Sequence, residues 1–337
     1  MNKTQRRVVH GANRINGINL QIGRVLRFGD AVKKKNFTKE HKYCDNCKAT
    51  TPTEPRILWN MNLARMGLLV SVDDILITGA DESLIIATKN YLHDQFTIKD
   101  MGYAKYFLGI ELARSSSGLY LHQRKYIMDI FTNAGLQNAK SIAYPMCPRI
   151  PHWNAAIHIL KYLIGCPSKG VFFSADSYFK LNAFCDADWA ACLDTRRSIS
   201  GYCIFLGSFL VSWKTKKQNI ESRSSAEAEN QSMTATVCKL KWISYLLKDF
   251  QIAPSPPINL HCDNQAALHI VVFHERTKHL EIDCHVVRNK VSKGFITIVK
   301  VYCKMQLADL FTKPSSNSSF QFLVSKLGLV SPHQSLT

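Results

Sequence analysis

The sequence predicts an α/β protein whose C-terminal half is built on five strands with flanking helices. From Gly67 onward, apolar runs alternate with turn signals, as the packed core of such a fold requires. Acidic residues recur where the expected strands end. The 337 residues include 43 Lys and Arg against 25 Asp and Glu, and the resulting net charge of +18 favours a polyanionic partner, most simply nucleic acid.

The composition excludes several other classes of protein. A hydrophobic content of 46% is too high for wholesale disorder or for collagen. No run approaches the ~18 uninterrupted apolar residues of a membrane span, and the basic N-terminus lacks the apolar core of a signal peptide. The eleven cysteines show no regular framework and indicate reduced thiols. We therefore expect an intracellular protein, cytoplasmic or nuclear, that is not secreted and has no membrane partner.

The first 66 residues differ from the rest of the chain. They contain 14 Lys and Arg but only 4 Asp and Glu, a net charge of +10, and they show no sustained helical or strand period. We place a domain boundary near residue 66. Two interpretations of residues 1–66 stay open, a solvated basic segment and a segment that binds nucleic acid.

A pair of adjacent acids, Asp73 and Asp74, lies between two short β-branched apolar runs in residues 67–79. This pattern predicts a β-hairpin with buried strands and with the acids at its turn. Two neighbouring carboxylates repel each other unless they are solvated or hold a cation such as Mg²⁺. A plain solvated turn and a metal-binding turn are both consistent with the spacing.

Four segments around this hairpin carry a family pattern: 70–76 (VSVDDIL), 96–102 (FTIKDMG), 107–112 (FLGIEL) and 118–123 (GLYLHQ). They resemble copia-type retrotransposon reverse transcriptases. The resemblance implies a truncated palm and primer-grip region over residues 67–148, with Asp73, Asp74 and Lys99 belonging to polymerase motifs. Ser71 replaces the tyrosine that is usual in the family. Residues 1–66 show neither the third carboxylate nor the fingers that such a polymerase needs, so we expect its polymerase activity to be lost through truncation.

The elements of the C-terminal half follow a proline-rich junction at residues 145–151. An amphipathic helix is expected over residues 152–163. Beyond Lys180 the expected order is three strands, a long helix, a strand, helices, a strand and a short final helix. Ser224 and Glu227 have the spacing of a capping box, and the long helix that they open carries an apolar core stripe. The five expected strands cover residues 180–186, 201–206, 209–213, 258–262 and 295–299.

Acidic residues recur at the ends of these elements. Asp186 ends the first strand, Asp263 follows the fourth, and Asp309 lies on the final helix. Asp188 is a weaker candidate because it falls beyond the strand end. Convergent carboxylates are what two Mg²⁺ ions ~4 Å apart need to activate water and stabilise the leaving oxygen in phosphodiester hydrolysis. On spacing alone, scattered surface acids explain the pattern equally well.

Two glutamates near the start of the long helix compete for the same role. Glu227 is already explained by the capping box. Glu229 lies four residues before Met233 and therefore projects from the buried face of the helix. An acid on that face is costly unless cations or hydrogen bonds meet it, so we choose Glu229.

Five segments of this half carry a second family pattern: 185–190 (CDADWA), 223–229 (RSSAEAE), 262–267 (CDNQAA), 274–279 (HERTKH) and 306–314 (QLADLFTKP). They resemble the copia-type RNase H domain, a mixed five-stranded sheet with flanking helices. The resemblance implies that Asp186, Glu229, Asp263 and Asp309 hold two Mg²⁺ ions, for which Mn²⁺ can substitute, and that no small-molecule cofactor is needed. It also implies that the substrate is the RNA strand of an RNA–DNA hybrid.

Basic side chains are candidates for contacts to the nucleic-acid backbone. Lys214, Lys216 and Lys217 leave the third strand together, although a solvated strand end explains them equally well. Arg276 and Lys278 precede a later helix and favour phosphate contact.

The sequence as a whole indicates a fragment of a copia-type Pol polyprotein. We expect a basic segment at 1–66, a truncated reverse transcriptase palm at 67–148, an RNase H-like domain at 152–330 and a tail at 331–337. The predicted function is Mg²⁺-dependent endoribonuclease activity on RNA–DNA hybrids. The alternative is a catalytically inactive remnant that only binds nucleic acid. In an intact element, the cytoplasmic location implied by the resemblance is a virus-like particle.

Overall fold

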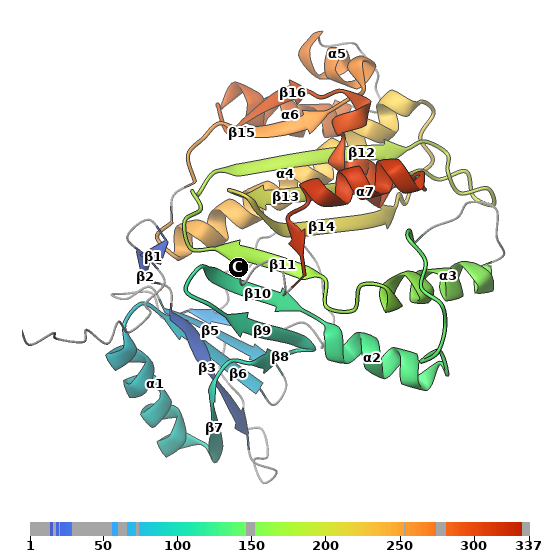
Figure 1. Cartoon of the computed structure of the whole chain (residues 1–337). Coiled ribbons are helices and arrows are strands. Elements are labelled where there is room, and N and C mark those ends of the chain that lie inside the picture. Colours follow the sequence, from blue (N-terminus) through green and yellow to red (C-terminus); the bar gives the residue numbers. More distant parts are fainter. Residues whose placement is uncertain are drawn as a thin grey trace, which may run out of the picture. The chain divides into compact units, whose positions relative to one another are not determined.

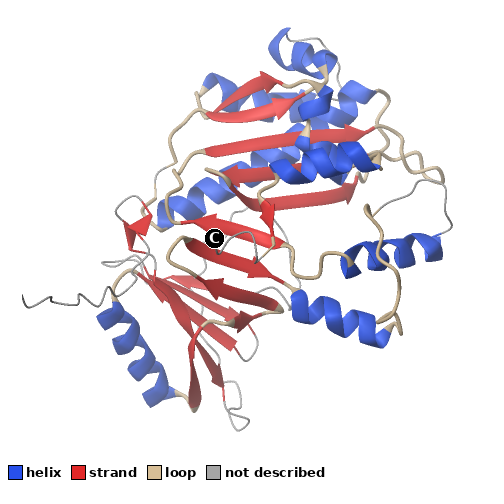
Figure 2. Cartoon of the chain, viewed as in Figure 1, coloured by secondary structure: helices blue, strands red, loops and turns tan. Residues whose placement is uncertain are grey.

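The computed structural model describes residues 14–15, 18–19, 21–28, 56–59, 66–71, 74–145, 152–252, 254–273 and 281–331. The chain divides into two compact units, an N-terminal unit (Met1–Leu112) and a C-terminal unit (Ala113–Thr337). Figure 1 colours them along the sequence, and Figure 2 marks their helices and strands. Within these described ranges, no helix combines the length and the hydropathy that a membrane span requires.

The N-terminal unit contains an antiparallel sheet of five strands in the order β4-β5-β6-β3-β7. The predicted pairing of the hairpin is confirmed, because β5 and β6 pair with Ser71 opposite Asp74. The expected burial is only partial, since β6 is buried at alternate positions, and Asp74 opens β6 instead of lying in the turn. Helix α1 begins after Asp81, whose carboxylate accepts a hydrogen bond from the Ser83 N–H at 2.9 Å. The elements up to residue 114 are β1 (Arg14–Ile15), β2 (Ile18–Asn19), β3 (Gln21–Phe28), β4 (Arg56–Trp59), β5 (Met66–Ser71), β6 (Asp74–Gly79), α1 (Glu82–Gln95), β7 (Ile98–Tyr103), β8 (Tyr106–Phe107) and β9 (Ile110–Arg114).

Strand β3 lies within the first 66 residues, where the sequence shows no sustained period. Its adjacent residues Val25 and Leu26 are both buried, and they belong to two different apolar clusters, one with Phe107 and the other with Ile75. The pairing of β3 with its neighbours also shifts register next to Arg24. A strand that is irregular and covered on both faces lacks the two-residue alternation that identifies strands in a sequence.

The C-terminal unit is built on a mixed sheet of five strands in the order β14-β13-β12-β15-β16. Strands β12, β13 and β14 pair antiparallel, whereas β15 and β16 continue the sheet parallel to β12. This strand order confirms the predicted RNase H-like class. The elements of this sheet and its helices are β12 (Leu181–Asp188), β13 (Ile199–Leu206), β14 (Phe209–Lys217), α4 (Ser225–Asp249), β15 (Ile258–Cys262), α5 (Gln265–Phe273), α6 (Glu281–Ser292), β16 (Ile296–Lys300), η1 (Cys303–Met305), η2 (Leu307–Phe311) and α7 (Asn317–Lys326).

A smaller antiparallel group of strands, β10, β11 and β17, accompanies this sheet in the C-terminal unit. Helix α3 covers the segment for which the sequence predicts an amphipathic helix. The bounds of these elements are β10 (Gly118–His122), α2 (Arg124–Asn133), α3 (His152–Ile164), β11 (Gly170–Ser174) and β17 (Leu329–Val330).

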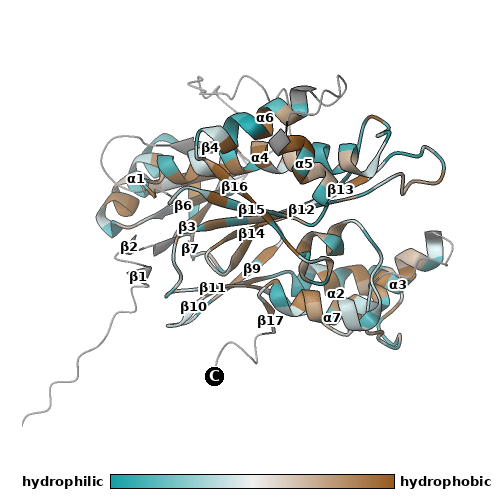
Figure 3. Cartoon of the chain, turned by 90° about the horizontal axis from the view of Figure 1, so that it is seen from above, coloured by the Kyte–Doolittle hydropathy of each residue, from teal (hydrophilic) through white to brown (hydrophobic). Residues whose placement is uncertain are grey.

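Helices cover both faces of the five-stranded sheet. Helix α4 packs against β12 and β13 on one face, and Figure 1 shows α7 on the opposite face. On that second face, η2 and α7 form an apolar cluster with Cys203, Phe205 and Leu210. Figure 3 shows brown apolar segments interleaved with teal polar ones along the strands between these layers. The sheet therefore has a buried interior that can position side chains at its strand ends.

The start of α4 follows the predicted capping box. The Ser224 hydroxyl oxygen accepts a hydrogen bond from the Glu227 N–H at 3.2 Å, and the Glu227 carboxylate accepts one from the Arg223 N–H at 2.7 Å. Both bonds satisfy backbone donors near the helix start. The predicted core stripe is buried from Met233 to Leu247.

Candidate metal centre

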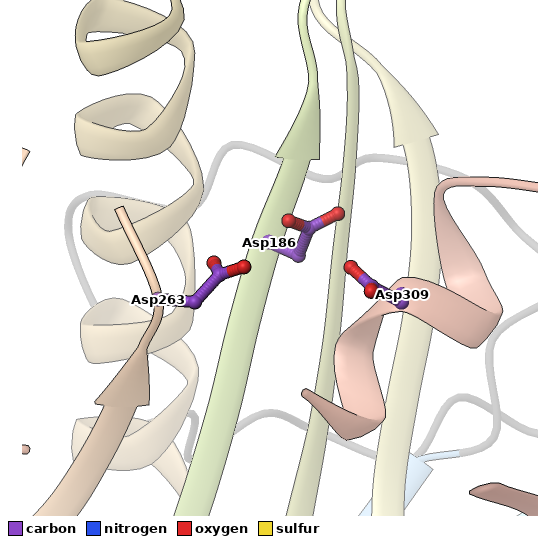
Figure 4. Close-up of side chains that lie close together, drawn as sticks. All are labelled: Asp186, Asp263 and Asp309. Atoms are coloured by element: carbon purple, nitrogen blue, oxygen red, sulfur yellow. The ribbon is translucent and has the colours of Figure 1, made fainter. Parts of the chain in front are cut away.

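Three aspartates from three elements converge at one edge of the five-stranded sheet. Asp186 lies on β12, Asp263 directly follows β15, and Asp309 lies on η2. One carboxylate oxygen from each lies within 4.8 Å of the other two. Figure 4 shows the three side chains converging from their three elements. The parallel register explains the first pair: Phe184 on β12 is beside His261 on β15, so Asp186 and Asp263, each two residues further on, share an edge and a face.

A buried glutamine connects the aspartates to the backbone. Gln306 is fully buried, and its amide nitrogen donates hydrogen bonds to the Cys185 carbonyl at 3.0 Å and to the Asp263 carboxylate at 3.4 Å. Its amide oxygen accepts a hydrogen bond from the Ala308 N–H, which caps η2. One side chain therefore links the start of η2 to both β12 and Asp263.

Asp186 is fully buried and is the most enclosed of the three acids. The Thr312 hydroxyl donates a hydrogen bond to one of its oxygens, and the Lys313 ammonium donates to the other at 2.9 Å. The same ammonium nitrogen donates to Asp309 at 2.9 Å. A buried carboxylate requires partners of this kind, because burial without them is strongly unfavourable.

Asp309 and Lys313 have pKa values that this cluster shifts. Burial and the nearby Asp186 raise the pKa of Asp309 to about 6, although Lys313 acts in the opposite direction. Burial lowers the pKa of Lys313, but Asp186 and Asp309 raise it by more, so its net shift is upward. Lys313 therefore carries its positive charge at neutral pH.

Glu229 lies close to this cluster but does not join it. Among the described residues, the group whose oxygens lie within 4.8 Å of one another contains only the three aspartates. Glu229 on α4 is 4% exposed, and its carboxylate accepts a hydrogen bond from the Ala187 N–H at 3.1 Å. Its other oxygen lies 3.9 Å from the sulfur of Cys262. Burial, followed by the neighbouring Cys262 and Asp186, raises the pKa of Glu229 to about 10.

The expectation that Asp188 falls beyond the strand end is wrong, because Asp188 is the last residue of β12. It lies on the same face of the strand as Asp186, because side chains two residues apart point the same way. Burial raises its pKa, Lys313 lowers it, and Asp186 raises it again. The structure therefore places a fourth aspartate near the edge of the cluster.

The three candidate lysines of β14 do not share one face. Lys214, Lys216 and Lys217 are all exposed. The register places Lys217 in line with Ile199 and Asp188, and Thr215 in line with Gly201 and Asp186. Lys217 is therefore on the face of the sheet that carries the aspartates. Lys214 and Lys216 are on the opposite face, which packs against α4.

The remaining predicted site residues belong to the N-terminal unit or lie outside the described residues. Asp74 is half-buried at the start of β6, and Lys99 is exposed on β7, both in the N-terminal unit. Asp73, Arg276 and Lys278 lie outside the described residues.

Three residues of this centre were not predicted as site residues from the sequence: Gln306, Thr312 and Lys313. The spacing of Asp309 and Lys313, four residues apart, is a usual signal for a side-chain pair on a helix. Nothing in the local sequence connects Lys313 to Asp186, which is 127 residues away.

Fold and site together define an RNase H-like domain with an acidic cluster suited to divalent cations. The matches below identify the chain as a fragment of a copia-type retrotransposon Pol polyprotein. Residues 59–148 match the family model described as reverse transcriptase (RNA-dependent DNA polymerase). The chain is 35% identical to the retrovirus-related Pol polyprotein from transposon RE2 of Arabidopsis thaliana, over 78% of this chain and 22% of that protein.

Further relatives extend this pattern. The chain is 36% identical to the corresponding polyprotein from transposon RE1 of Arabidopsis thaliana, over 78% of this chain and 21% of that protein. It is 32% identical to the uncharacterized mitochondrial protein AtMg00810 of Arabidopsis thaliana, over 53% of this chain and 95% of that protein. The chain thus spans about a fifth of the length of the two polyproteins.

Solved structures of RNase H proteins match part of the chain at low similarity. LC11-RNase H1 in complex with an RNA/DNA hybrid matches 40% of this chain and 94% of its own, at 10% identity and a TM-score of 0.32. RNase H1 from the halophilic archaeon Halobacterium salinarum NRC-1 matches 42% of this chain and 98% of its own, at 15% identity and a TM-score of 0.28.

Proposed function

We propose that residues 152–330 form a divalent-cation-dependent ribonuclease that cleaves the RNA strand of RNA–DNA hybrids. The observation that supports this proposal is the convergence of Asp186, Asp263 and Asp309 within 4.8 Å at one edge of the sheet. The net charge of +18 is consistent with a nucleic-acid substrate. We propose an RNA–DNA hybrid, and not another nucleic acid, as the substrate because of the family to which the chain belongs.

The residues present fit divalent cations. Every candidate ligand is a carboxylate, and carboxylate oxygens are the hard ligands that Mg²⁺ and Mn²⁺ prefer. Asp186 is fully buried beside two other acids, an arrangement that cations stabilise because they neutralise the mutual repulsion. Asp186, Asp263, Asp309 and the adjacent Glu229 would hold the ions. When bound, the ions would supply activation of a water molecule and stabilisation of the leaving oxygen.

The chain's own residues prepare this edge of the sheet for the reaction. Gln306 orients Asp263 and holds the start of η2 against β12. Thr312 orients Asp186 from the end of the same element. Lys217 and Trp213 lie on the aspartate face of β14, where an ammonium and an exposed aromatic ring suit a phosphate backbone and its sugars or bases. The sheet therefore positions the aspartates, and the exposed side chains of β14 contact the substrate.

A cleavage assay on the full chain tests this proposal. We expect Mg²⁺ to support cleavage of the labelled RNA strand in an RNA–DNA hybrid. An RNA–RNA duplex and a DNA–DNA duplex should not be cleaved. Asp263→Asn should abolish cleavage, whereas the matched control Asp249→Asn, an exposed acid at the end of α4, should retain it. If the wild-type chain binds the hybrid without cutting it, the proposal fails and a catalytically inactive binding protein becomes the better description.

A further inference from the structure

The Lys313 ammonium occupies the position between two carboxylates where a divalent cation would be expected to bind. Its ammonium nitrogen lies 2.9 Å from an oxygen of Asp186 and 2.9 Å from an oxygen of Asp309. These are two of the three carboxylates that converge on the candidate metal centre. The positive charge therefore bridges two acids that a divalent cation at this centre would also have to bridge.

Local structure holds Lys313 at this position. Its backbone N–H donates to the Asp309 carbonyl at 2.9 Å, and the preceding Thr312 donates its hydroxyl to Asp186. The end of η2 is therefore anchored on both acids through adjacent residues. The side chain of Lys313 is 38% exposed, whereas that of Asp186 is fully buried. Lys313 thus covers Asp186 from the solvent side.

The Lys313 ammonium and a divalent cation would compete for the same two carboxylates. An ammonium and a divalent ion in contact with the same carboxylates repel each other strongly in a partly buried site. A lysine has a long flexible stem, and the exposed fraction of Lys313 gives its ammonium a route into solvent. Release of the ammonium from Asp186 and Asp309 would therefore favour cation binding.

We propose that Lys313 is an internal counter-ion of the acidic cluster, which holds Asp186 and Asp309 together in the cation-free protein and competes with divalent cations for them. This inference rests on the proposed function, because it takes the aspartate cluster to be a cation site. Lys313 is a positioning residue: it acts on the reaction through the two carboxylates. Its presence raises the cation concentration that the centre needs and keeps the acids from repelling each other before the cation arrives.

Calorimetric titration of the metal-free full chain with Mn²⁺ tests the proposal without any activity measurement. Lys313→Gln removes the charge and retains a polar side chain, so we expect Mn²⁺ to bind about tenfold more tightly than to the wild type. The same variant should lower the melting temperature of the metal-free protein, and saturating Mn²⁺ should reduce that difference. The control Lys248→Gln, an exposed lysine in the last turn of α4, should change neither quantity.

Two further variants show whether the Mn²⁺ signal comes from the cluster and whether the charge of Lys313 controls it. Asp263→Asn should remove Mn²⁺ binding, which assigns the binding signal to the cluster. Lys313→Arg retains the charge in a guanidinium that binds two carboxylates more firmly, so its Mn²⁺ affinity should equal or fall below the wild-type value even if Lys313→Gln does not fold.

The outcomes separate this proposal from the proposed function. Equal Mn²⁺ affinity in the wild type and Lys313→Gln would overturn the role of Lys313 and leave the metal centre intact. Binding by Lys313→Gln alone would support the role of Lys313 and contradict nuclease activity in the native chain. Absence of binding in both proteins would overturn both proposals.

Discussion

Glu229 accepts a hydrogen bond from the backbone N–H of Ala187, the residue that follows Asp186 on β12. The bond joins an acid of α4 to the strand that carries the most buried aspartate of the cluster. It satisfies one carboxylate oxygen, but burial still raises the pKa of Glu229 to about 10. Glu229 is therefore an acid whose ionisation the fold opposes in the absence of a cation.

This relationship predicts that Glu229→Gln stabilises the metal-free protein at alkaline pH. The folded-state pKa is raised above the usual 4.5, so the stability that protonated Glu229 contributes is complete below pH 4.5 and is lost as pH rises toward 10. The glutamine cannot ionise and avoids this loss. We expect a gain of about 1–3 kcal/mol at pH 8 and little difference at pH 4.5. Thermal melts in a chelator at both pH values measure the gain.

The exposed Glu221→Gln provides the matched control and should show no such pH-dependent gain. A melting temperature of Glu229→Gln that falls below the wild-type value at pH 8 would contradict this account. The same variant should lose hybrid cleavage, because it removes one of the proposed ligands.

Removing the buried amide of Gln306 should loosen the centre and the fold together. Gln306→Ala leaves the Ala308 N–H and the Cys185 carbonyl without their partner and removes a donor from Asp263. We expect a loss of about 2–4 kcal/mol in the free energy of unfolding, from both the lost hydrogen bonds and the cavity. Urea denaturation measures it, and the exposed Gln95→Ala should lose far less. A loss below that of the control would show that Gln306 is not a structural link.

The two faces of β14 predict different roles for neighbouring lysines. Lys217 is on the face that carries the aspartates, and Lys214 is on the other. We expect Lys217→Ala to weaken hybrid binding and to reduce the slope of log affinity against log salt by about 1, the effect of one lost phosphate contact. Lys214→Ala is the matched control and should leave the slope unchanged. Fluorescence anisotropy at several salt concentrations, without divalent cations, measures the hybrid affinity of both variants. Equal slopes in the two variants would rule out a specific phosphate contact by Lys217.

Sequence patterns predicted most of the C-terminal unit because its elements are regular. The capping box at Ser224 identified the start of α4, and apolar runs between turn signals identified the strands. Strand β3 escaped prediction, since Val25 and Leu26 are buried in different clusters and its register is irregular. Local patterns carry no signal for a strand of that kind.

The candidate site was partly predictable for a related reason. Asp186 lies near the end of β12 and Asp263 directly follows the parallel strand β15, so their approach follows from topology, and Asp309 was proposed from its motif. The bridge from Lys313 to Asp186 joins residues 127 positions apart, and this lysine is one of 43 basic residues. The packing of η2 against β12 and β13 brings it to the cluster. The roles of all these residues in cation binding stay a proposal.

A glycine opposite Asp186 is required by the packing of η2. Gly201 on β13 pairs with Asp186, and a Cβ atom at this position would lie 2.7 Å from the Thr312 methyl carbon and 2.8 Å from the Phe311 Cβ. Gly201→Ala should therefore push the end of η2 away from Asp186. We expect a loss of about 1–3 kcal/mol in the free energy of unfolding, the usual range for overpacking, together with weaker Mn²⁺ binding and slower hybrid cleavage. Urea denaturation and Mn²⁺ titration measure the two effects.

A second substitution separates this contact from a general defect of the strand. Thr312→Ser removes the methyl carbon that meets the new side chain and retains the hydroxyl that donates to Asp186. Added to Gly201→Ala, it should restore part of the lost stability, although the contact with Phe311 persists. If the double variant is no more stable than the sum of the two single changes predicts, then crowding between β13 and the Thr312 methyl is not the cause, because coupled neighbours depart from additivity.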